Sequence, residues 1–357
     1  MNSATHLQDM EIAHRRTLRL ALGVSLSLFV SQLISWPLSF IMPLITMVLL
    51  LFPIPAPPLK QAAVLILALA LPMYLCIALL LPLFETSRMA AILLLILIWF
   101  GCFYFSAAGG PAIIGLFMTA GIAMVVAIGS VSTDAMLDIA ANLSFGTIAG
   151  ILFVWLAHAL LPDLPGTFAM SRPQQQEKPS TQQAQRGAFR TLMIVFPVVL
   201  FCLFSSDSMS YLVLMIKSAS MGQQASTDQS RAMGRSLLES TFWGGIAAII
   251  CWQLLVIHPS LLLYCLLVAL AMLIMGARLF QGAGLHPRGE MWIYALITML
   301  VLLGPSVQDG QMGKDASSAF YFRLYLFGVI AVYGSVAVAV FDAFWRPSGI
   351  RQKPKPS

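Results

Sequence analysis

The stretch LPDLPGTFAMSRPQQQEKPSTQQAQR, residues 161–186, is the only long polar segment in an otherwise apolar sequence of 357 residues. It lies near the middle of the chain and is rich in Gln, Pro and Ser, a composition that favours a mobile linker. The triplet RTL opens an apolar run soon after it, at 190–192, as the same triplet does near the start of the chain, at 16–18. The position of this linker predicts two related halves.

The composition is typical of a helical membrane protein. Hydrophobic residues make up 59% of the chain and charged residues 10%, whereas a soluble domain has about 25% charged residues. The mean hydropathy is +0.88. The apolar runs are long enough for bilayer-crossing helices and do not alternate as the strands of a membrane β-barrel do. We therefore expect an all-α polytopic protein with the lipid bilayer as its main surroundings.

About twelve transmembrane segments, with ten as the lower bound, are predicted, six on each side of the linker. They include the third span at about 61–82, the seventh at about 191–204, the tenth at 260–280 and the eleventh at about 291–305, which is expected to end at Pro305. Threading them alternately through a bilayer with the N-terminus inside collects most Lys and Arg on the inner side, as the positive-inside rule requires. The sequence therefore predicts a multi-pass membrane protein with an uncleaved first span and both termini cytoplasmic. The net charge of +6 follows from this distribution and not from nucleic acid binding. Basic residues expected at the cytoplasmic edge include Arg19, which flanks the first span, and Lys60, Arg231 and Arg235.

An ungapped overlay of Arg16 on Arg190 also places Ser31 on Ser205, and Lys60 within one residue of Arg235. The order of long span, short span, basic loop and long span recurs, which predicts two six-span repeats in the same orientation, related by an axis along the membrane normal. The predicted domains are an N-terminal membrane half (1–162), a cytoplasmic linker (163–189), a C-terminal membrane half (190–346) and a cytoplasmic tail (347–357).

Three segments carry a family resemblance: RTLRLALGVSLSLFVSQLISWPLSFIMPLITMVLLLFP at 16–53, SRAMGRSLLESTFWGGIAA at 230–248 and ALITMLVLLGPS at 295–306. With these segments the chain resembles the fusaric acid resistance (FUSC)-like family of inner-membrane proteins, which includes aromatic acid exporters. It looks most like a short branch described mainly as a domain of unknown function. The resemblance implies a location in the bacterial inner membrane and export of small aromatic or amphipathic acids, with a periplasmic adaptor of the HlyD-like type and an outer-membrane channel. Unlike the longer members, this sequence has no large cytoplasmic domain.

Two short apolar segments occupy matching positions in the two halves, 37–52 and 211–221. Pro43 is expected to interrupt the first, and Lys217 falls on Pro43 in the overlay. Broken segments indicate a transport site because their freed backbone groups can meet a ligand, and a charge at this depth is costly and functional by default. We expect Lys217 to bind an anionic small-molecule substrate; the alternative is that it snorkels to the cytoplasmic interface. Further substrate-binding candidates are Pro43, Ser31, Gln32 and Ser205.

Glu239 and Asp207 are candidates for proton coupling. Glu239 lies about one turn inside its span and could partner Lys217, but the alternative is an ion pair with Arg235 four residues earlier. Asp207 follows the seventh span and is either a proton acceptor or a solvated loop residue. Serine and glutamine side chains near the first span could line a polar path or bond neighbouring helices. Arg323 is expected to pair with an acidic loop residue or to anchor the last span at the interface.

No metal or cofactor site is expected. The sequence contains no P-loop, dinucleotide fingerprint or nucleophile motif, and its five cysteines lack ligand spacing, which is typical of packing residues. We therefore expect no enzyme but a secondary transporter driven by an ion gradient. The alternative is a non-transporting membrane subunit that docks an adaptor or an assembly partner. A homo-oligomer is compatible with both.

Overall fold

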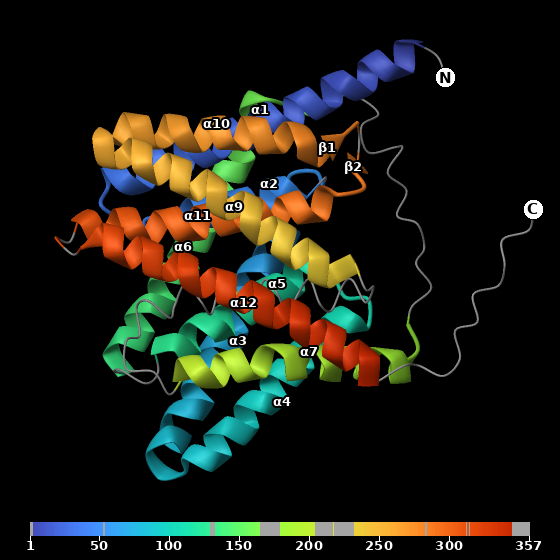
Figure 1. The fold of residues 1–357 in the computed structure, drawn as a ribbon, viewed down its shortest axis with the longest axis vertical. Helices are drawn as coiled ribbons and strands as arrows, with labels where there is room; N and C mark the ends of the chain where they lie inside the picture. Colours follow the sequence, from blue (N-terminus) through green and yellow to red (C-terminus); the bar gives the residue numbers. More distant parts are fainter. Residues whose placement is uncertain are drawn as a thin grey trace, which may run out of the picture.

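The computed structural model describes residues 3–52, 54–128, 133–164, 179–203, 217, 232–282, 284–311, 313 and 315–344. These described residues contain eleven α-helices and one two-stranded antiparallel ribbon. The elements are α1 (Ser3–Leu33), α2 (Ile41–Leu51), α3 (Leu59–Thr86), α4 (Arg88–Ala107), α5 (Ala112–Ile128), α6 (Thr133–Leu160), α7 (Thr181–Leu203), α9 (Ala232–Ile257), α10 (Leu261–Leu279), β1 (Phe280–Gln281), β2 (Gly284–Leu285), α11 (Gly289–Gln311) and α12 (Ala316–Phe344) (Figure 1).

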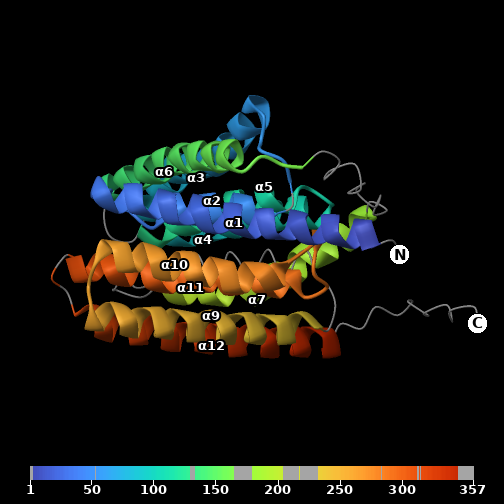
Figure 2. The ribbon, with the colours of Figure 1, turned by 90° about the horizontal axis from the view of Figure 1, so that it is seen from above.

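The helices form a layered bundle. Helices α1 to α6 lie on one side of the molecule and α9 to α12 on the other, with most axes running in similar directions (Figure 2). Among the described residues, eight helices are long and apolar enough to cross a membrane: α3, α4, α6, α7, α9, α10, α11 and α12. The apolar helix α2 and the apolar stretch Ile113–Ala123 of α5 are shorter. The prediction of an all-α polytopic membrane protein is confirmed, while the number twelve stays a prediction.

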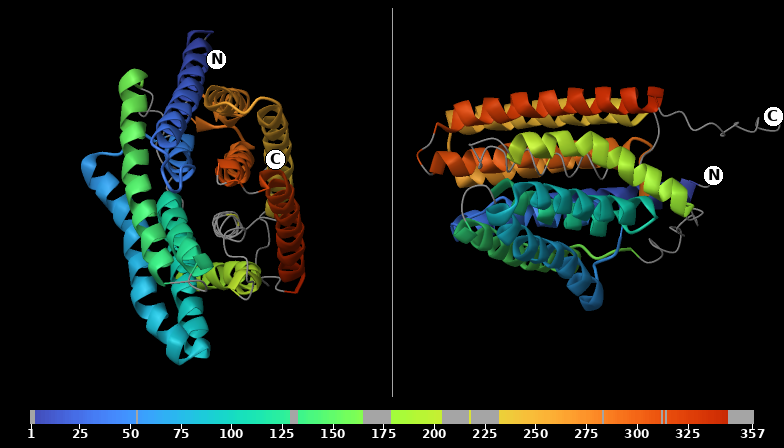
Figure 3. Two further views of the ribbon diagram at one scale, coloured as in Figure 1. Left: turned by 90° about the vertical axis from the view of Figure 1, so that its left-hand side faces the viewer. Right: turned by 90° about the horizontal axis from the view of Figure 1, so that it is seen from below.

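Helix α11 is the central helix of the C-terminal side. Of its membrane-length window, 83% is buried inside the protein, compared with 28% to 56% for the other seven long apolar helices. It packs against α9, α10, α12 and α2, and Figure 3 shows it enclosed by α9, α10 and α12. Gly244 of α9 permits this close packing, because a Cβ atom there would lie 2.4 Å from the backbone oxygen of Ala295 on α11.

Helix pairs recur between the two sides of the molecule. The overlay of residue 16 on 190, an offset of 174, places α3 on α9, α4 on α10 and α5 on α11. Correspondingly, α3 packs against α5 and α6 as α9 packs against α11 and α12. Helix α1 packs against α10, and the helices that correspond to these two in the overlay, α7 and α4, also pack against each other. This recurrence supports the inferred duplication.

The predicted linker, 163–189, is too long at its C-terminal end. Helix α7 already begins at Thr181, because Ser180 and Gln183 form a reciprocal cap. The Gln183 backbone N–H donates to Ser180 Oγ at 3.3 Å, and the Ser180 N–H donates to Gln183 Oε1 at 3.1 Å. The helix therefore includes the last nine residues assigned to the linker.

Two prolines that were expected to interrupt or end a span lie within helices. Pro43 was expected to interrupt the second span, but it lies in the first turn of α2, where a missing N–H costs no helical hydrogen bond. Pro305 was expected to end the eleventh span, yet α11 continues through it to Gln311. The neighbouring helices bury this part of α11, and the continuation places Asp309 inside a helix and not in a loop.

Candidate functional site

Arg323 of α12 is almost completely buried and bonds two side chains of α11. Its Nη2 donates to Asp309 Oδ2 at 2.5 Å, and its Nη1 donates to Ser306 Oγ at 3.1 Å. Ser306 and Asp309 stand three residues apart and therefore share one face of α11. A buried guanidinium needs such partners because desolvation of a charge is costly. Of the two alternatives for Arg323, the pairing with an acidic residue is confirmed, although that residue is helical.

Lys217 lies in the same region of the bundle and is 3% exposed. Its Nζ donates to Thr298 Oγ1 of α11 at 2.7 Å and stands 5.6 Å from the ring centroid of Phe327 on α12. The side chain is therefore buried and does not snorkel to an interface. A buried ammonium is costly in a membrane protein and by default indicates function.

These side chains form one group along the contact between α11 and α12. Thr298 and Ser306 are eight residues apart, about 12 Å along the helix axis at 1.5 Å per residue. On α12, Phe327 follows Arg323 by one turn. We refer to Lys217, Thr298, Ser306, Asp309 and Arg323 as the α11 cluster. The cluster places two cationic side chains at different depths beside the most deeply buried long helix.

Gln32 ties the end of α1 to the end of α11. Its Nε2 donates to Ser39 Oγ at 2.9 Å, and its Oε1 accepts from Gln311 Nε2 at 2.9 Å. Gln308 of α11 donates to the backbone oxygen of Pro37. The neighbouring Ser31 is fully buried and donates to Leu28 within α1. Gln32 therefore acts between helices, while Ser31 is satisfied within its own helix.

A cavity of about 540 Å³ opens at this end of the bundle. Side chains of α1, α9, α10 and α11, together with the residue before α12, line it; they include Gln32, Trp252, Tyr264, Ser306, Gln311 and Asp315. Ser306 connects the cavity to the α11 cluster, since it also accepts the bond from Arg323. The cavity and the cluster are therefore adjacent.

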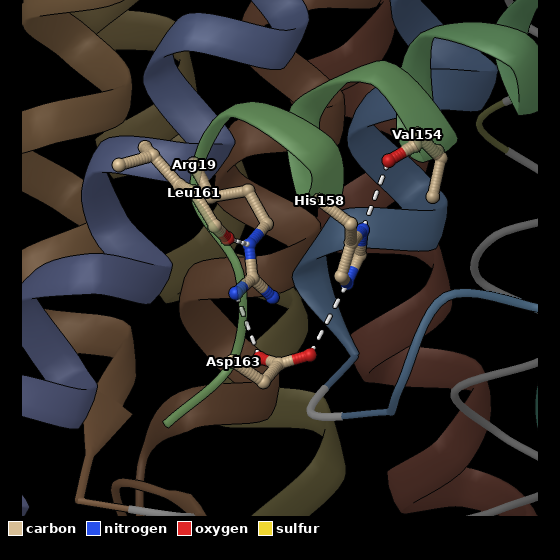
Figure 4. Close-up of polar contacts among 5 residues, drawn as sticks. All are labelled: Arg19, Val154, His158, Leu161 and Asp163. Atoms are coloured by element: carbon tan, nitrogen blue, oxygen red, sulfur yellow. Dashed lines mark hydrogen bonds and ion pairs between the residues drawn. The ribbon is translucent and has the colours of Figure 1, made fainter. Parts of the chain in front are cut away.

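A second polar cluster joins α1 to the end of α6 (Figure 4). Arg19 was expected to be a basic flank, but it is 4% exposed; its Nε donates to the Leu161 oxygen at 2.9 Å and its Nη2 to Asp163 Oδ1 at 2.7 Å. His158 Nδ1 lies 2.9 Å from the Val154 oxygen, and His158 Nε2 lies 3.9 Å from Asp163 Oδ2. Asp163, the first residue of the predicted linker, is thus fixed to the N-terminal half.

Glu239, one of the two predicted proton-coupling residues, pairs with Arg235 and not with Lys217 of the α11 cluster. Glu239 accepts from Arg235 Nε at 2.6 Å in a partly exposed pair, which is the alternative of an ion pair four residues apart. Lys60 and Arg235 are exposed near the starts of α3 and α9. Ser205, Asp207 and Arg231 lie outside the described residues. The described part of the chain contains no group of three His, Cys, Asp or Glu side chains placed to hold a metal ion.

Sequence reasoning missed Asp309 as a site residue because it treated Pro305 as the end of a span. Two signals were available. Ser306 and Asp309 have the spacing of one helix face, and Arg323 is a cation without a charged neighbour in its own apolar segment. The prediction gave more weight to the tendency of Pro305 to end a helix than to these two signals.

The fold and these buried charges define a multi-pass helical membrane protein. Residues 16–157, from α1 to near the end of α6, match a family described as a protein of unknown function (DUF2955). No curated protein and no solved structure matches the chain. The match is to a domain of unknown function, as the predicted resemblance included, and it shows no link to the fusaric acid resistance-like family.

Proposed function

We propose that the protein is a secondary transporter of the bacterial inner membrane that exports small aromatic or amphipathic organic acids. The observation that carries this proposal is Lys217, a cationic side chain buried between α11 and α12. A structural role alone is a poor reason to bury an ammonium, since apolar side chains of similar volume often stabilise such positions equally well.

Lys217 serves as the anion site. A carboxylate near its Nζ gains more Coulomb energy inside the protein than in water, because the effective dielectric constant is lower there. The ring of Phe327, 5.6 Å from Nζ, provides an apolar surface for the body of an aromatic acid. Thr298 orients the ammonium by accepting a bond from it.

Asp309 is the proton-coupling residue in this proposal, in place of Glu239, which pairs with Arg235; the role of Asp207 stays a prediction. In its charged form Asp309 binds Arg323, and in its protonated form it binds the guanidinium less strongly. Protonation therefore releases a second buried cation next to the cavity. An inward proton gradient could drive the acid outward by alternating these two states.

The proposed orientation, partners and lack of a cofactor are based on the sequence alone. Both termini are placed in the cytoplasm by the positive-inside rule, and the resemblance supplies an HlyD-like adaptor and an outer-membrane channel as partners. No cofactor is required, since an ion gradient drives the cycle, and the chain is proposed not to be an enzyme.

The test uses the full chain in proteoliposomes, with radiolabelled salicylate and 4-hydroxybenzoate as probes and an imposed pH gradient. These weak acids also enter protein-free liposomes in their neutral form, so accumulation is measured as the excess over protein-free liposomes. We expect such an excess, and it should collapse when a protonophore removes the gradient. Lys217→Ala should abolish it, and Thr298→Val should reduce it. Lys60→Ala, which removes an exposed lysine, should retain it. Absence of probe movement and of probe-dependent proton flux in the wild-type chain would contradict the proposal and favour a non-transporting docking subunit.

A further inference from the structure

The cavity beside the α11 cluster has the construction of a binding site. Its volume of about 540 Å³ lies within the range of small-molecule sites, roughly 300–1,000 Å³. Trp252, Leu255 and Leu261 supply apolar walls. The Trp252 ring is held rigid by stacking on Phe320, with 5.1 Å between the centroids and an interplanar angle of 13°.

Tyr264 lines this cavity and carries a buried hydroxyl without a hydrogen-bond partner in the described part of the chain. The residue is 2% exposed. A buried hydroxyl without a partner costs about 1–3 kcal/mol. A ligand atom that accepts a hydrogen bond would remove this cost. Gln32, Ser306 and Gln311 offer further polar atoms around the same space.

Among the described residues, the charges around the cavity do not favour an anion. Arg323, behind Ser306, is already paired with Asp309. Asp315 is the charged side chain among the described lining residues, and it is negative. The cavity is therefore unlike the Lys217 environment, where a cation is buried.

The helix ends around the cavity also do not favour an anion. Helices α1, α9 and α11 end here and present the negative ends of their dipoles, whereas α10 and α12 begin here and present positive ends. Both positive ends are capped: Ser260 Oγ accepts from the Leu263 N–H at 3.2 Å, and Asp315 Oδ1 accepts from the Ser318 N–H at 3.1 Å. The two helix N-termini at the cavity are therefore already capped and offer little to an anion.

We propose that this cavity binds an uncharged amphipathic molecule, with an aromatic or aliphatic body against Trp252 and a hydrogen-bonding head at Tyr264. A primary amide, an alcohol or a phenol has the required chemistry. The site is separate from the anion site at Lys217 and does not depend on the proposed transport activity.

The experiment compares two probes of nearly the same shape, naphthalene-2-carboxamide and 2-naphthoate. Their binding to the full chain in nanodiscs is measured by equilibrium dialysis at neutral pH, with empty nanodiscs subtracted. The carboxamide should bind at least tenfold more tightly than the carboxylate. Asp315→Asn should narrow this difference by strengthening naphthoate binding. Equal or tighter binding of the carboxylate overturns the charge preference, and absence of carboxamide binding overturns the site.

Variants locate the bound probe. Tyr264→Phe removes only the hydroxyl and should weaken carboxamide binding about three- to tenfold. Tyr325→Phe removes a hydroxyl from an exposed tyrosine of α12 and should leave binding unchanged. Lys217→Ala should also leave it unchanged, so that failure of the transport proposal is distinguishable from failure of this one. An unaltered affinity in Tyr264→Phe contradicts the proposal.

A second measurement does not depend on altering Tyr264. Ser317→Cys places a thiol in the lining of the cavity, whereas the native cysteines that the structure describes are buried. The carboxamide should slow the reaction of this thiol with N-ethylmaleimide, relative to the wild-type background. An unchanged rate at saturating carboxamide counts against the proposed position.

Discussion

Asp309 of α11 and Arg323 of α12 form a buried ion pair at 2.5 Å, fourteen residues apart in the chain and on opposite sides of the turn between the two helices. Their side chains are 11% and 3% exposed. The pair therefore differs in kind from the Arg235–Glu239 pair of α9, in which Arg235 is 78% exposed.

We expect removal of one member of the buried pair to be strongly destabilising. Asp309→Ala leaves a buried guanidinium without its carboxylate, which costs about 3–5 kcal/mol, whereas Glu239→Ala breaks an exposed pair worth about 0.3–0.5 kcal/mol. The measurement is the midpoint of thermal unfolding of each purified variant in detergent. Replacing both members, in Asp309→Leu with Arg323→Leu, should recover much of the loss. Equal midpoints for the two single variants would contradict the buried arrangement.

Lys217→Met separates function from stability. The substitution removes a buried charge but keeps most of the side-chain volume, so the unfolding midpoint should stay the same or rise. Anion transport in proteoliposomes should nevertheless be lost, because the ammonium is the proposed anion site. Lys60→Met, at an exposed position near the start of α3, is the matched control and should change neither quantity. A large fall in the midpoint of Lys217→Met would assign the lysine a structural role.

The membrane class and most helices could be predicted from the sequence because bilayer thickness fixes the length of an apolar span. The predicted spans 61–82 and 260–280 correspond to α3 and α10 within a few residues. Helix ends were harder to predict. The cap of Ser180 and Gln183 is a local signal that composition concealed, and Pro305 stays helical because tertiary packing outweighs its local preference.

The contacts of the site could not be predicted in the same way. Lys217 was identified as a costly charge in an apolar segment, with snorkelling to the interface as the alternative, and its partner Thr298 lies 81 residues away in the chain. Gln32 was identified as polar within a span, yet its bond to Gln311 crosses 279 residues. Helical periodicity places such residues on a face of one helix. Which faces meet depends on the packing of the whole bundle.

Gly244 tests the close contact between α9 and α11. In Gly244→Ala the new Cβ would lie 2.4 Å from the Ala295 backbone oxygen, so the helices must separate, at an expected cost of about 1–3 kcal/mol. In Gly245→Ala the nearest atom is the flexible Leu324 Cδ1 at 3.2 Å, and the cost should be smaller. Thermal unfolding of the two variants measures the difference. A Gly245→Ala variant that is less stable than Gly244→Ala would contradict this packing.

The two ends of the bundle provide a test of orientation. With the N-terminus inside, the start of α9 faces the cytoplasm and the cavity faces the outside, because α1 ends at the cavity. In spheroplasts, a membrane-impermeant maleimide should therefore label Ser317→Cys, whereas Arg235→Cys should be labelled only after the membrane is lysed. Arg235 is a suitable position because its side chain is 78% exposed. The wild-type chain corrects for the native cysteines. If Arg235→Cys is labelled in intact spheroplasts and Ser317→Cys is not, the orientation is opposite to the predicted one, and the cavity faces the cytoplasm.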